Sequence, residues 1–579
     1  MKRKDALVIG AYLLLAAYVC IRYWADLDGI SSYNPPDHTW FQWIFSHGAY
    51  SVRHMENPLF SIRQNFPDGV NMMANTSLLG VTLPFAPITV LAGPQLTYVL
   101  FLTLGLAATA ATAYWLLSRH LVGSRSAAFV GGAFLGFAPG IISHANGQPN
   151  FVSNFLLAII VARVLSLGDL PHRRLRSGLI LGLLVTYQIF INEEMLLITA
   201  LACAAIVVVY ALQRWPEARA RLTSFATSLS VAGVVVVVLA GLAILYQFTG
   251  PQSYRGLQAF QDLGEDLKGF VTFGRDAIAG TPYVAQPIEL AEQNTWLGWP
   301  LVVVSVLIAI ALWRRSLAAR TTAVVGAVFA FLSLGPEVTF DGRPTGIPGP
   351  WRLIPDDLPI VELVIPTRLS LVAVGAVGVL LALAWDHAVR ALRRDRPSHH
   401  RAVSALTIIA ITAALIPILP RPLPTESGQP LPRFITSNAW RRFVPDGRTL
   451  VPVPIPSFFH GVSTLRWSAS TQHAFAVPAG YFVGPDRRGR GIWGAPYRPT
   501  TSLVYAAMDT GVVPSVTAAD ADRAIEDLTY WRASVVVLGK HPDEATLREL
   551  MTRLLGSPRR IDDVWLWDVR ELVGDKRSG

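Results

Sequence analysis

The sequence has little cysteine and few charged residues for its length of 579 residues. Its two cysteines, Cys20 and Cys203, both lie in apolar runs, which excludes a disulfide-stapled exported domain and a cysteine metal site. Charged residues make up about a quarter of a typical soluble domain, but only 15% of this chain, while 52% is hydrophobic and the mean hydropathy is +0.41. These deficits exclude an ordinary soluble protein and indicate a polytopic membrane protein.

Lysine is also scarce, with 5 lysines in a total of 49 basic residues. This preference for arginine is typical of a high-GC bacterial genome. The net charge of +10 does not indicate nucleic-acid binding, because the basic residues fall mostly in short clusters between apolar runs. That distribution is typical of cytoplasmic loops.

A membrane span needs roughly 20 apolar residues, and about eleven windows approach that length. The predicted spans are 5–24, 95–117, 126–142, 150–167, 177–192, 194–212, 226–248, 297–313, 321–336, 367–387 and 402–420. The first window has no signal-cleavage site, so we interpret it as an uncleaved helix. The stretch 77–92 is short and contains Pro84 and Pro87, which favours a re-entrant or interfacial segment.

Arginine and lysine clusters alternate with these windows, as the positive-inside rule requires. This pattern predicts a cytoplasmic N-terminus and a multi-pass protein of the plasma membrane. The long polar segments then fall outside, namely 26–75, 250–294, 337–366 and the tail after Pro420. We therefore expect the protein to act at the outer membrane surface.

The tail changes to the composition of a soluble domain. We predict a transmembrane module over 1–420 with an outer loop over 25–77, a proline-rich linker over 421–432 and an extracytoplasmic α/β domain over 433–579. The predicted elements in this domain are a strand over 450–453, a helix from the cap Thr517 to Tyr530, a strand over 533–538, a helix over 543–555 and a strand over 563–569.

Asp37 is the first candidate for catalysis. It follows two prolines and precedes an aromatic run that includes Trp40, which predicts a short helix at the membrane interface. A partly desolvated carboxylate there is suited to act as a general base on an attacking hydroxyl. The alternative is that Asp37 only caps the helix. His38 and Trp40 are assigned to substrate binding beside it.

Arg53, His54 and Arg63 follow in the same outer loop. Guanidinium groups match phosphate oxygens in bidentate geometry, so these residues predict a binding site for a lipid-linked phosphate. Contact with ordinary lipid headgroups, or with the loop surface, is the alternative.

Glu193 and Glu194 lie in the middle of a long apolar run, where acids are costly and are functional candidates. We assign Glu193 a catalytic role and Glu194 a role in substrate binding, with an exposed hairpin tip as the alternative. Gln148 belongs to a small polar loop over 144–150 that suits sugar hydroxyls or a metal.

Arg368 begins the tenth predicted span on the outer side, where an arginine opposes the positive-inside trend. This position favours phosphate binding in a groove, whereas snorkelling toward headgroups is the alternative. The basic, glycine-rich loop over 480–494 is interpreted as a surface loop, with contact to an anionic polymer as the second reading.

Several motifs carry a resemblance to a known superfamily. They are PPDHTWFQWIF, NPLF followed by FPDGVNMMANTS, FINEEMLL, LPIVELVIPTRLSL, PAGYFVGP and VWLWDV. With an acid in the first outer loop, the chain resembles the GT-C superfamily of integral-membrane glycosyltransferases, and within it an uncharacterised actinobacterial group.

The resemblance implies an inverting transfer of a sugar from a polyprenyl-phosphate donor, with Asp37 as the base. The acceptor would be an envelope glycan, lipid or protein, and nucleic acid is not an expected partner. Many members carry paired acids with a divalent metal, whereas here His38 follows Asp37, so Mg²⁺ or Mn²⁺ stays open. The rival hypothesis is a transporter or flippase of lipid-linked envelope precursors, but the chain lacks a clear internal repeat.

Overall fold

The computed structural model describes residues 3–169, 171–257, 263–281, 292–354, 364–393 and 398–574. The chain divides into two compact units, and each is described by itself. Unit 1 consists of Met1–Asn34, Val99–Gly241 and Gln258–Thr425, and unit 2 of Pro35–Tyr98, Leu242–Leu257 and Glu426–Gly579. The segment 35–98, which the sequence places in the transmembrane module, therefore groups with the C-terminal part of the chain.

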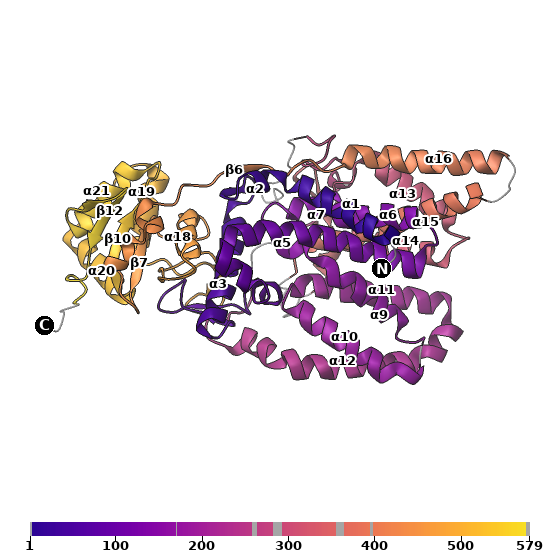
Figure 1. The fold of residues 1–579 in the computed structure, drawn as a ribbon, viewed down its shortest axis with the longest axis horizontal. Coiled ribbons are helices and arrows are strands. Elements are labelled where there is room, and N and C mark those ends of the chain that lie inside the picture. Colours follow the sequence, from indigo (N-terminus) through magenta and orange to yellow (C-terminus); the bar gives the residue numbers. More distant parts are fainter. Residues whose placement is uncertain are drawn as a thin grey trace. The chain divides into compact units, whose positions relative to one another are not determined.

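Unit 1 is mainly helical (Figure 1). Its helices are α1 (Arg3–Val19), α2 (Ile21–Ala25), most of α5 (Ala86–Leu116), α6 (Arg125–Phe137), α7 (Pro139–His144), α8 (Pro149–Val152), α9 (Leu157–Ser166), α10 (Arg174–Ile189), α11 (Glu193–Gln213), most of α12 (Trp215–Thr249), α13 (Trp299–Leu312), α14 (Leu317–Leu332), α15 (Ser370–Arg393) and α16 (Ser398–Leu415). Unit 1 also contains short helical turns, which are η1 (Leu117–Leu121), η2 (Asn154–Leu156), η3 (Pro171–Arg173), η4 (Gly269–Val271), η6 (Pro350–Leu353), η8 (Pro366–Leu369) and η9 (Ile416–Ile418). Its strands are β1 (Gly29–Ser31), β4 (Glu337–Phe340) and β5 (Arg343–Pro348).

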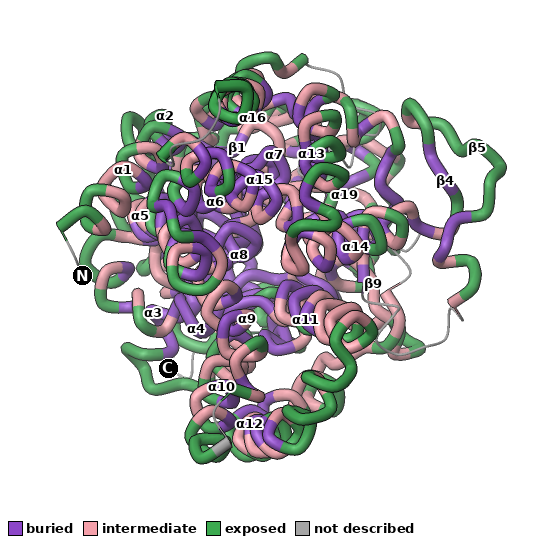
Figure 2. Tube along the Cα trace, turned by 90° about the vertical axis from the view of Figure 1, so that its right-hand side faces the viewer, coloured by how far each residue is buried: buried purple, intermediate pink, exposed green. Residues whose placement is uncertain are grey.

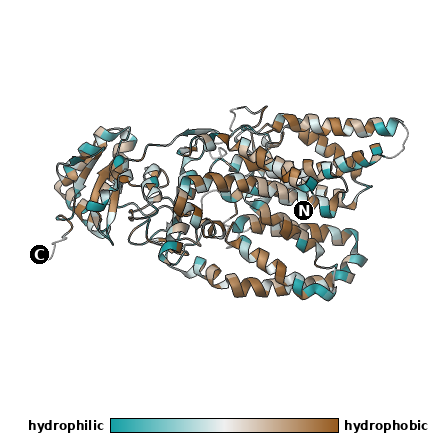
Figure 3. Ribbon diagram, viewed as in Figure 1, coloured by the Kyte–Doolittle hydropathy of each residue, from teal (hydrophilic) through white to brown (hydrophobic). Residues whose placement is uncertain are grey.

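Each predicted span coincides with helix in the structure. In the described part of the chain, 7 stretches are long and apolar enough to cross a membrane, and α13 and α14 are shorter apolar helices. The long stretches are Ala86–Leu121, Arg125–His144, Pro149–Ser166, Glu193–Gln213, Trp215–Thr249, Pro366–Arg393 and Ser398–Ile418. Figure 3 shows hydrophobic residues along much of α11 and α12. A membrane protein is thus supported, while the count of eleven spans stays a prediction.

Helix α15 is the packing centre of unit 1, because it contacts α6, α14 and α16. Small residues let α6 and α15 approach closely. A Cβ added to Gly131 would lie 2.9 Å from the Cβ of Ala382, and one on Gly378 would lie 2.9 Å from Leu135. By contrast, only 17% of the most apolar window of α12 is buried, so this helix presents its side chains outward (Figure 2).

Unit 2 begins with α3 (Pro35–His54), which contacts α4 (Leu79–Thr82) and α18 (Leu465–Ser470). Gly48 permits the close approach, since a Cβ there would lie 2.7 Å from Thr82. The sequence predicts a short interfacial helix here. The structure instead has a 20-residue helix, and its residues 38–51 are buried. The predicted re-entrant segment contains α4 and the start of α5, which kinks at Gly93 (φ 83°).

The C-terminal part of unit 2 is an α/β arrangement. Its helices and turns are α17 (Arg433–Thr436), η10 (Ala439–Arg442), η11 (Val462–Thr464), α18, α19 (Pro499–Thr510), α20 (Ala518–Tyr530) and α21 (Glu544–Leu555). The strands of unit 2 are β2 (Phe60–Ser61), β3 (Val70–Asn71), β7 (Thr449–Val453), β8 (Val483–Pro485), β9 (Gly491–Trp493), β10 (Ala533–Leu538), β11 (Arg559–Ile561) and β12 (Val564–Asp568), and β6 (Thr425–Ser427) lies at the boundary with unit 1.

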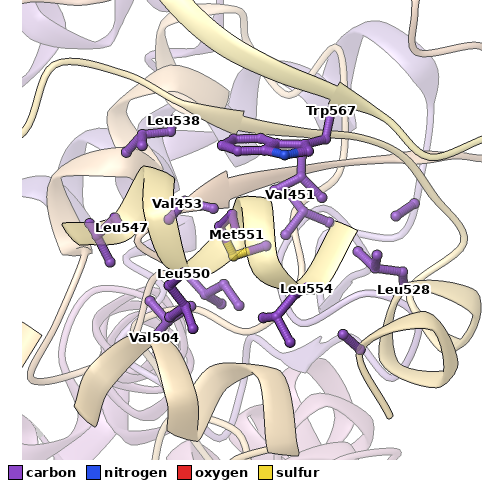
Figure 4. Close-up of a cluster of buried hydrophobic side chains, with 14 of the residues drawn as sticks. Val451, Val453, Val504, Leu528, Leu538, Leu547, Leu550, Met551, Leu554 and Trp567 are labelled. Atoms are coloured by element: carbon purple, nitrogen blue, oxygen red, sulfur yellow. The ribbon is translucent and has the colours of Figure 1, made fainter. Parts of the chain in front are cut away.

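The four-stranded sheet has the order β11-β12-β10-β7. Strand β10 pairs in parallel with β7, Val536 opposite Val451, and antiparallel with β12, Val536 opposite Trp567. Its apolar side packs on α19, α20 and α21, where Leu550 and Met551 enter the core (Figure 4). The element bounds fall within about two residues of the predicted ones, and Thr517 forms the expected cap of α20.

Candidate functional site

Asp37 lies in the first turn of α3, as the third residue of that helix. An acid in this position interacts favourably with the positive end of the helix dipole. The helix begins at Pro35, so Asp37 is inside the helix and is not its N-cap. Its side chain accepts a hydrogen bond from the hydroxyl of Tyr481, with 2.5 Å between the two oxygens. A half-buried carboxylate is thus held in place by a residue from the far end of the sequence.

Tyr481 is itself buried and packed between aromatic rings. Its ring stacks on Phe458, with centroids 5.0 Å apart, and lies 6.3 Å from Trp40. Burial, and then the negative charge and hydrogen bond of Asp37, raise the pKa of Tyr481 well above its usual range. The phenol therefore stays neutral at physiological pH and donates to the carboxylate.

The two aromatic-ring candidates next to Asp37 are almost fully enclosed. His38 has no exposed surface, contacts Gln42 at 2.9 Å and lies against the ring of Tyr98. Burial, with a smaller effect of Arg466, lowers the pKa of His38 to about 3, so it is neutral at physiological pH. Trp40 is 4% exposed and donates its indole N–H to the carbonyl of Thr76. Substrate binding by either side chain stays a prediction.

The basic candidates of the outer loop differ in how they are held. Arg53 is exposed at the end of α3. His54 stacks on Tyr50 and contacts its carbonyl at 3.0 Å. Arg63 donates to the hydroxyl of Tyr50 and lies 3.8 Å from the carboxylate of Glu56. The exposed side chain of Arg53 is open to an approaching phosphate.

Unit 1 contains a separate cluster around Arg368 in η8. Its Nε lies 3.1 and 3.2 Å from the two carboxylate oxygens of Glu292. Another guanidinium nitrogen donates to Glu194, and the third to Glu292 again. Arg368 also lies over the ring of Phe151, 4.4 Å from its centroid. The predicted outer-side arginine is thus bound to two acids in a poorly exposed site.

His144 connects this ion-pair cluster to the polar loop over 144–150. One ring nitrogen lies 2.5 Å from Oε1 of Gln148, the other 2.7 Å from Oδ1 of Asn294 and 3.7 Å from the carboxylate of Glu292. Gly140 allows α7 to approach Asn294, because a Cβ there would lie 2.2 Å from the Asn294 carbonyl oxygen. The structure therefore brings Gln148, Glu194 and Arg368 into one network.

Glu292 is the acid of this network that the sequence analysis missed. Burial alone would raise its pKa, but Arg368, His144 and the hydrogen bonds from Arg368 and Asn294 together lower it below the usual value. It is therefore ionised and balances the arginine. The signal available in the sequence was an acid shortly before an apolar window. Glu292 lies in the loop over 250–294, part of which lies outside the described residues, and the sequence of this loop does not indicate which residue Glu292 pairs with.

The two acids at the start of α11 have different roles. Asn192 caps the helix by accepting from the backbone N–H of Met195 at 3.0 Å. Glu194 then joins Arg368, whereas Glu193 is half-buried beside it. The exposed-tip alternative does not describe Glu194, whose side chain is 21% exposed. Catalysis by Glu193 stays a prediction.

A second buried acid lies next to this network. Glu265 accepts hydrogen bonds from the hydroxyls of Thr295 and Thr367, and from Ser370 at 3.3 Å. Thr367 also accepts from Asn294 at 3.2 Å. These contacts hold η8 to the chain before α13 and fix the position from which Arg368 extends.

No three histidine, cysteine or acid side chains gather in a metal-binding arrangement among the residues that the structure describes. No step of the proposed reaction uses a metal. Asp37 belongs to unit 2 and Arg368 to unit 1, so the composite site of Asp37, Glu193 and Arg368 stays a prediction.

Comparison with known proteins identifies the fold. The model of a family described as a domain of unknown function, DUF6311, matches residues 11–354. A search of curated proteins finds no significant match. Among solved structures, the archaeal oligosaccharyltransferase AglB from Archaeoglobus fulgidus, in complex with an inhibitory peptide and a dolichol-phosphate, is similar with a TM-score of 0.50 and 13% identity, over 95% of this chain and 72% of that chain.

Two further solved structures are similar. The same archaeal enzyme in complex with Zn and sulfate has a TM-score of 0.52 and 12% identity, over 92% of this chain and 68% of that chain. The arabinofuranosyltransferase AftD from Mycobacteria has a TM-score of 0.57 and 14% identity, over 98% of this chain but 40% of that chain. The chain thus spans less than half the length of AftD. At these identities the likeness shows the fold, and the predicted GT-C-like fold is confirmed.

Proposed function

The chain belongs to the DUF6311 family, and we propose that it is a membrane glycosyltransferase. It would move a sugar from a polyprenyl-phosphate donor to a cell-envelope acceptor on the outer side of the membrane. The shared fold with AglB and AftD supports this reaction class. The distribution of basic clusters in the sequence supports the outer location.

The observation that carries the proposal is Asp37 held by Tyr481 at the start of α3. This hydrogen bond holds a half-buried carboxylate in a defined position in the first turn of α3. Because Tyr481 remains protonated, its hydroxyl donates a hydrogen bond that holds the carboxylate in place. A carboxylate held in this way is suited to act as a general base, which supports the proposal.

In the proposed reaction, Asp37 takes the proton of an acceptor hydroxyl as its oxygen attacks the anomeric carbon of the donor sugar. The bond between that carbon and the phosphate oxygen breaks, and polyprenyl phosphate leaves with the electron pair. Attack opposite the leaving group inverts the anomeric configuration. The exposed Arg53 is suited to the phosphate, since its guanidinium group can form paired hydrogen bonds to phosphate oxygens.

The test is the Asp37→Asn variant in purified full-length protein, assayed for sugar transfer from a polyprenyl-phosphate donor. Loss of a general base is expected to slow transfer by about 10²- to 10⁴-fold. Asp68→Asn is a matched control, because Asp68 also belongs to unit 2 and accepts from a tyrosine hydroxyl, that of Tyr530 at 2.6 Å. Full activity of Asp37→Asn with a folded protein would contradict the proposal.

A further inference from the structure

The chain near Asp37 continues into a row of aromatic rings. Tyr481, which holds Asp37, stacks on Phe458 with an interplanar angle of 8°. Phe458 in turn lies 4.4 Å from the ring of Trp493 in β9, and Phe459 beside it is 68% exposed. The row therefore runs from the carboxylate of Asp37 to a solvent-accessible ring within unit 2.

A basic hairpin borders this row. Strands β8 and β9 pair with Val483 opposite Trp493, which connects the hairpin directly to the aromatic row. At its tip, the carboxylate of Asp486 accepts from the backbone N–H groups of Arg488 and Arg490 at 2.7 and 2.8 Å. These hydrogen bonds fix the turn, so the arginines are presented from a defined backbone.

The hairpin is supported by the segment that follows α12. The backbone N–H of Arg255 donates to Gly489, and that of Gly491 donates to Arg255 at 2.9 Å. The ring of Tyr254 packs on Gly491, where a Cβ would lie 2.7 Å from it. The segment after α12 is thus bridged to the two-stranded hairpin at Arg490, next to β9.

The charge of this surface is positive. Asp486 lies 3.5 Å from Arg490 and compensates that side chain in part. Arg487 and Arg488 are exposed, and within the described part of the chain neither guanidinium group has an acidic partner. Two uncompensated arginines next to stacked rings favour a ligand with flat apolar faces and acidic groups.

Sugar rings in acidic glycans have both properties. Their C–H faces pack on aromatic rings, and their carboxylates or phosphates accept paired hydrogen bonds from arginine. Because the row ends at Asp37, a glycan lying along it would bring a hydroxyl to the proposed base. This inference rests on the proposed function. We propose that the acceptor is an acidic glycan and that it binds along the aromatic row of Phe458, Phe459 and Trp493 and to the guanidinium groups of Arg487 and Arg488.

The experiment measures calorimetric binding of tetragalacturonate to the full-length protein in detergent. The neutral methyl ester of this tetrasaccharide is the matched probe. Wild-type protein is expected to bind the acidic form more tightly than the ester. The double variant R487Q/R488Q should lose that preference and bind the acidic form about tenfold more weakly, the effect of losing one hydrogen bond to a charged group.

Aromatic variants test the other half of the proposal. Trp493→Ala should weaken binding of both the acid and the ester by about three- to tenfold, the range for one lost ring contact. Because Trp493 belongs to β9, the exposed Phe459→Ala provides a second variant that leaves the hairpin pairing intact. Unchanged binding in both aromatic variants would overturn the role of the aromatic row.

Three controls make the result specific. The double variant R441Q/R442Q removes two exposed arginines from η10 in the same unit, and an equal loss there would show general charge attraction and overturn the proposal. A different outcome would assign the surface to lipid headgroups and overturn the proposal. In that outcome, wild-type protein binds vesicles containing phosphatidylglycerol but not tetragalacturonate, and R487Q/R488Q loses the vesicle binding. Asp37→Asn should keep probe binding, so failure of the proposed catalysis and failure of this inference are distinguishable.

Discussion

The network around Arg368 gives a quantitative prediction for the Arg368→Ala variant. The side chains of Arg368, Glu292 and Glu194 are 12%, 5% and 21% exposed. Removing the arginine leaves two carboxylates facing each other in a site that water reaches poorly. Breaking a buried ion pair by removing one partner costs about 3–5 kcal/mol. We expect the free energy of unfolding of Arg368→Ala to fall by that amount.

The assay is thermal unfolding of the purified protein in one detergent, with each variant measured at the same protein concentration. Arg221→Ala is the matched control, because Arg221 pairs with Asp169 in the same unit at 2.7 Å while both side chains are about half exposed, 48% and 47%. Such exposed pairs contribute about 0–1 kcal/mol. The two arginines thus separate the effect of burial from the effect of pairing.

The two acids should rank in a fixed order. Glu292 accepts from two guanidinium nitrogens and from Asn294, whereas Glu194 accepts from one guanidinium nitrogen and is more exposed. Glu292→Gln should therefore destabilise the protein more than Glu194→Gln. Equal unfolding temperatures for Arg368→Ala and Arg221→Ala, or the reverse order of the two acids, would refute this reading of the cluster.

Three further predictions follow from single contacts. Tyr481→Phe removes the hydrogen bond to Asp37. The turnover number for transfer should fall by about tenfold or more, which corresponds to the loss of one hydrogen bond to a charged group. The KM for the donor, measured in steady-state kinetics, should stay unchanged. Gly140→Ala places a Cβ 2.2 Å from the carbonyl oxygen of Asn294 and should cost about 1–3 kcal/mol in thermal unfolding. The pKa of His38 falls from an ordinary 6.5 to about 3 in the folded protein. Between pH 3 and pH 6.5 the unfolded state therefore binds more protons than the folded state. The stability that is present above pH 6.5 is thus lost on acidification. At pH 5 the loss is about 2 kcal/mol, and a His38→Gln variant should show a smaller difference between unfolding at pH 7.5 and at pH 5.

The helices were predictable because their signals are local. A run of about 20 apolar residues favours a lipid-spanning helix whatever surrounds it, and the capping threonine Thr517 marks the start of α20 through its own side chain. The strand 533–538 was found for the same reason, since it is a short apolar β-branched run. The composition of the units was not predictable, because the grouping of 35–98 with the C-terminal residues depends on contacts such as that of α3 with α18.

The partners of the candidate residues were also out of reach. Asp37 and Tyr481 are 444 positions apart, and Arg368 and Glu194 are 174 positions apart. Nothing in the residues around Tyr481 distinguishes a catalytic support from an ordinary core aromatic. Residue type alone therefore identified Asp37, Glu194 and Arg368 as unusual, and only the tertiary contacts show what each of them touches.

The contacts of Arg368 bear on its predicted role as a phosphate ligand. As a single cation at the outer end of a span, Arg368 is suited to bind an anion, but its guanidinium group is already paired with the carboxylates of Glu194 and Glu292. A phosphate would add more negative charge at close range and would be repelled unless a carboxylate released the arginine. Glu194 is the one suited to do so, because it is more exposed and is bound through a single guanidinium nitrogen. Phosphate binding at Arg368 would thus be coupled to release of Glu194, whereas binding at the exposed Arg53 would need no such exchange.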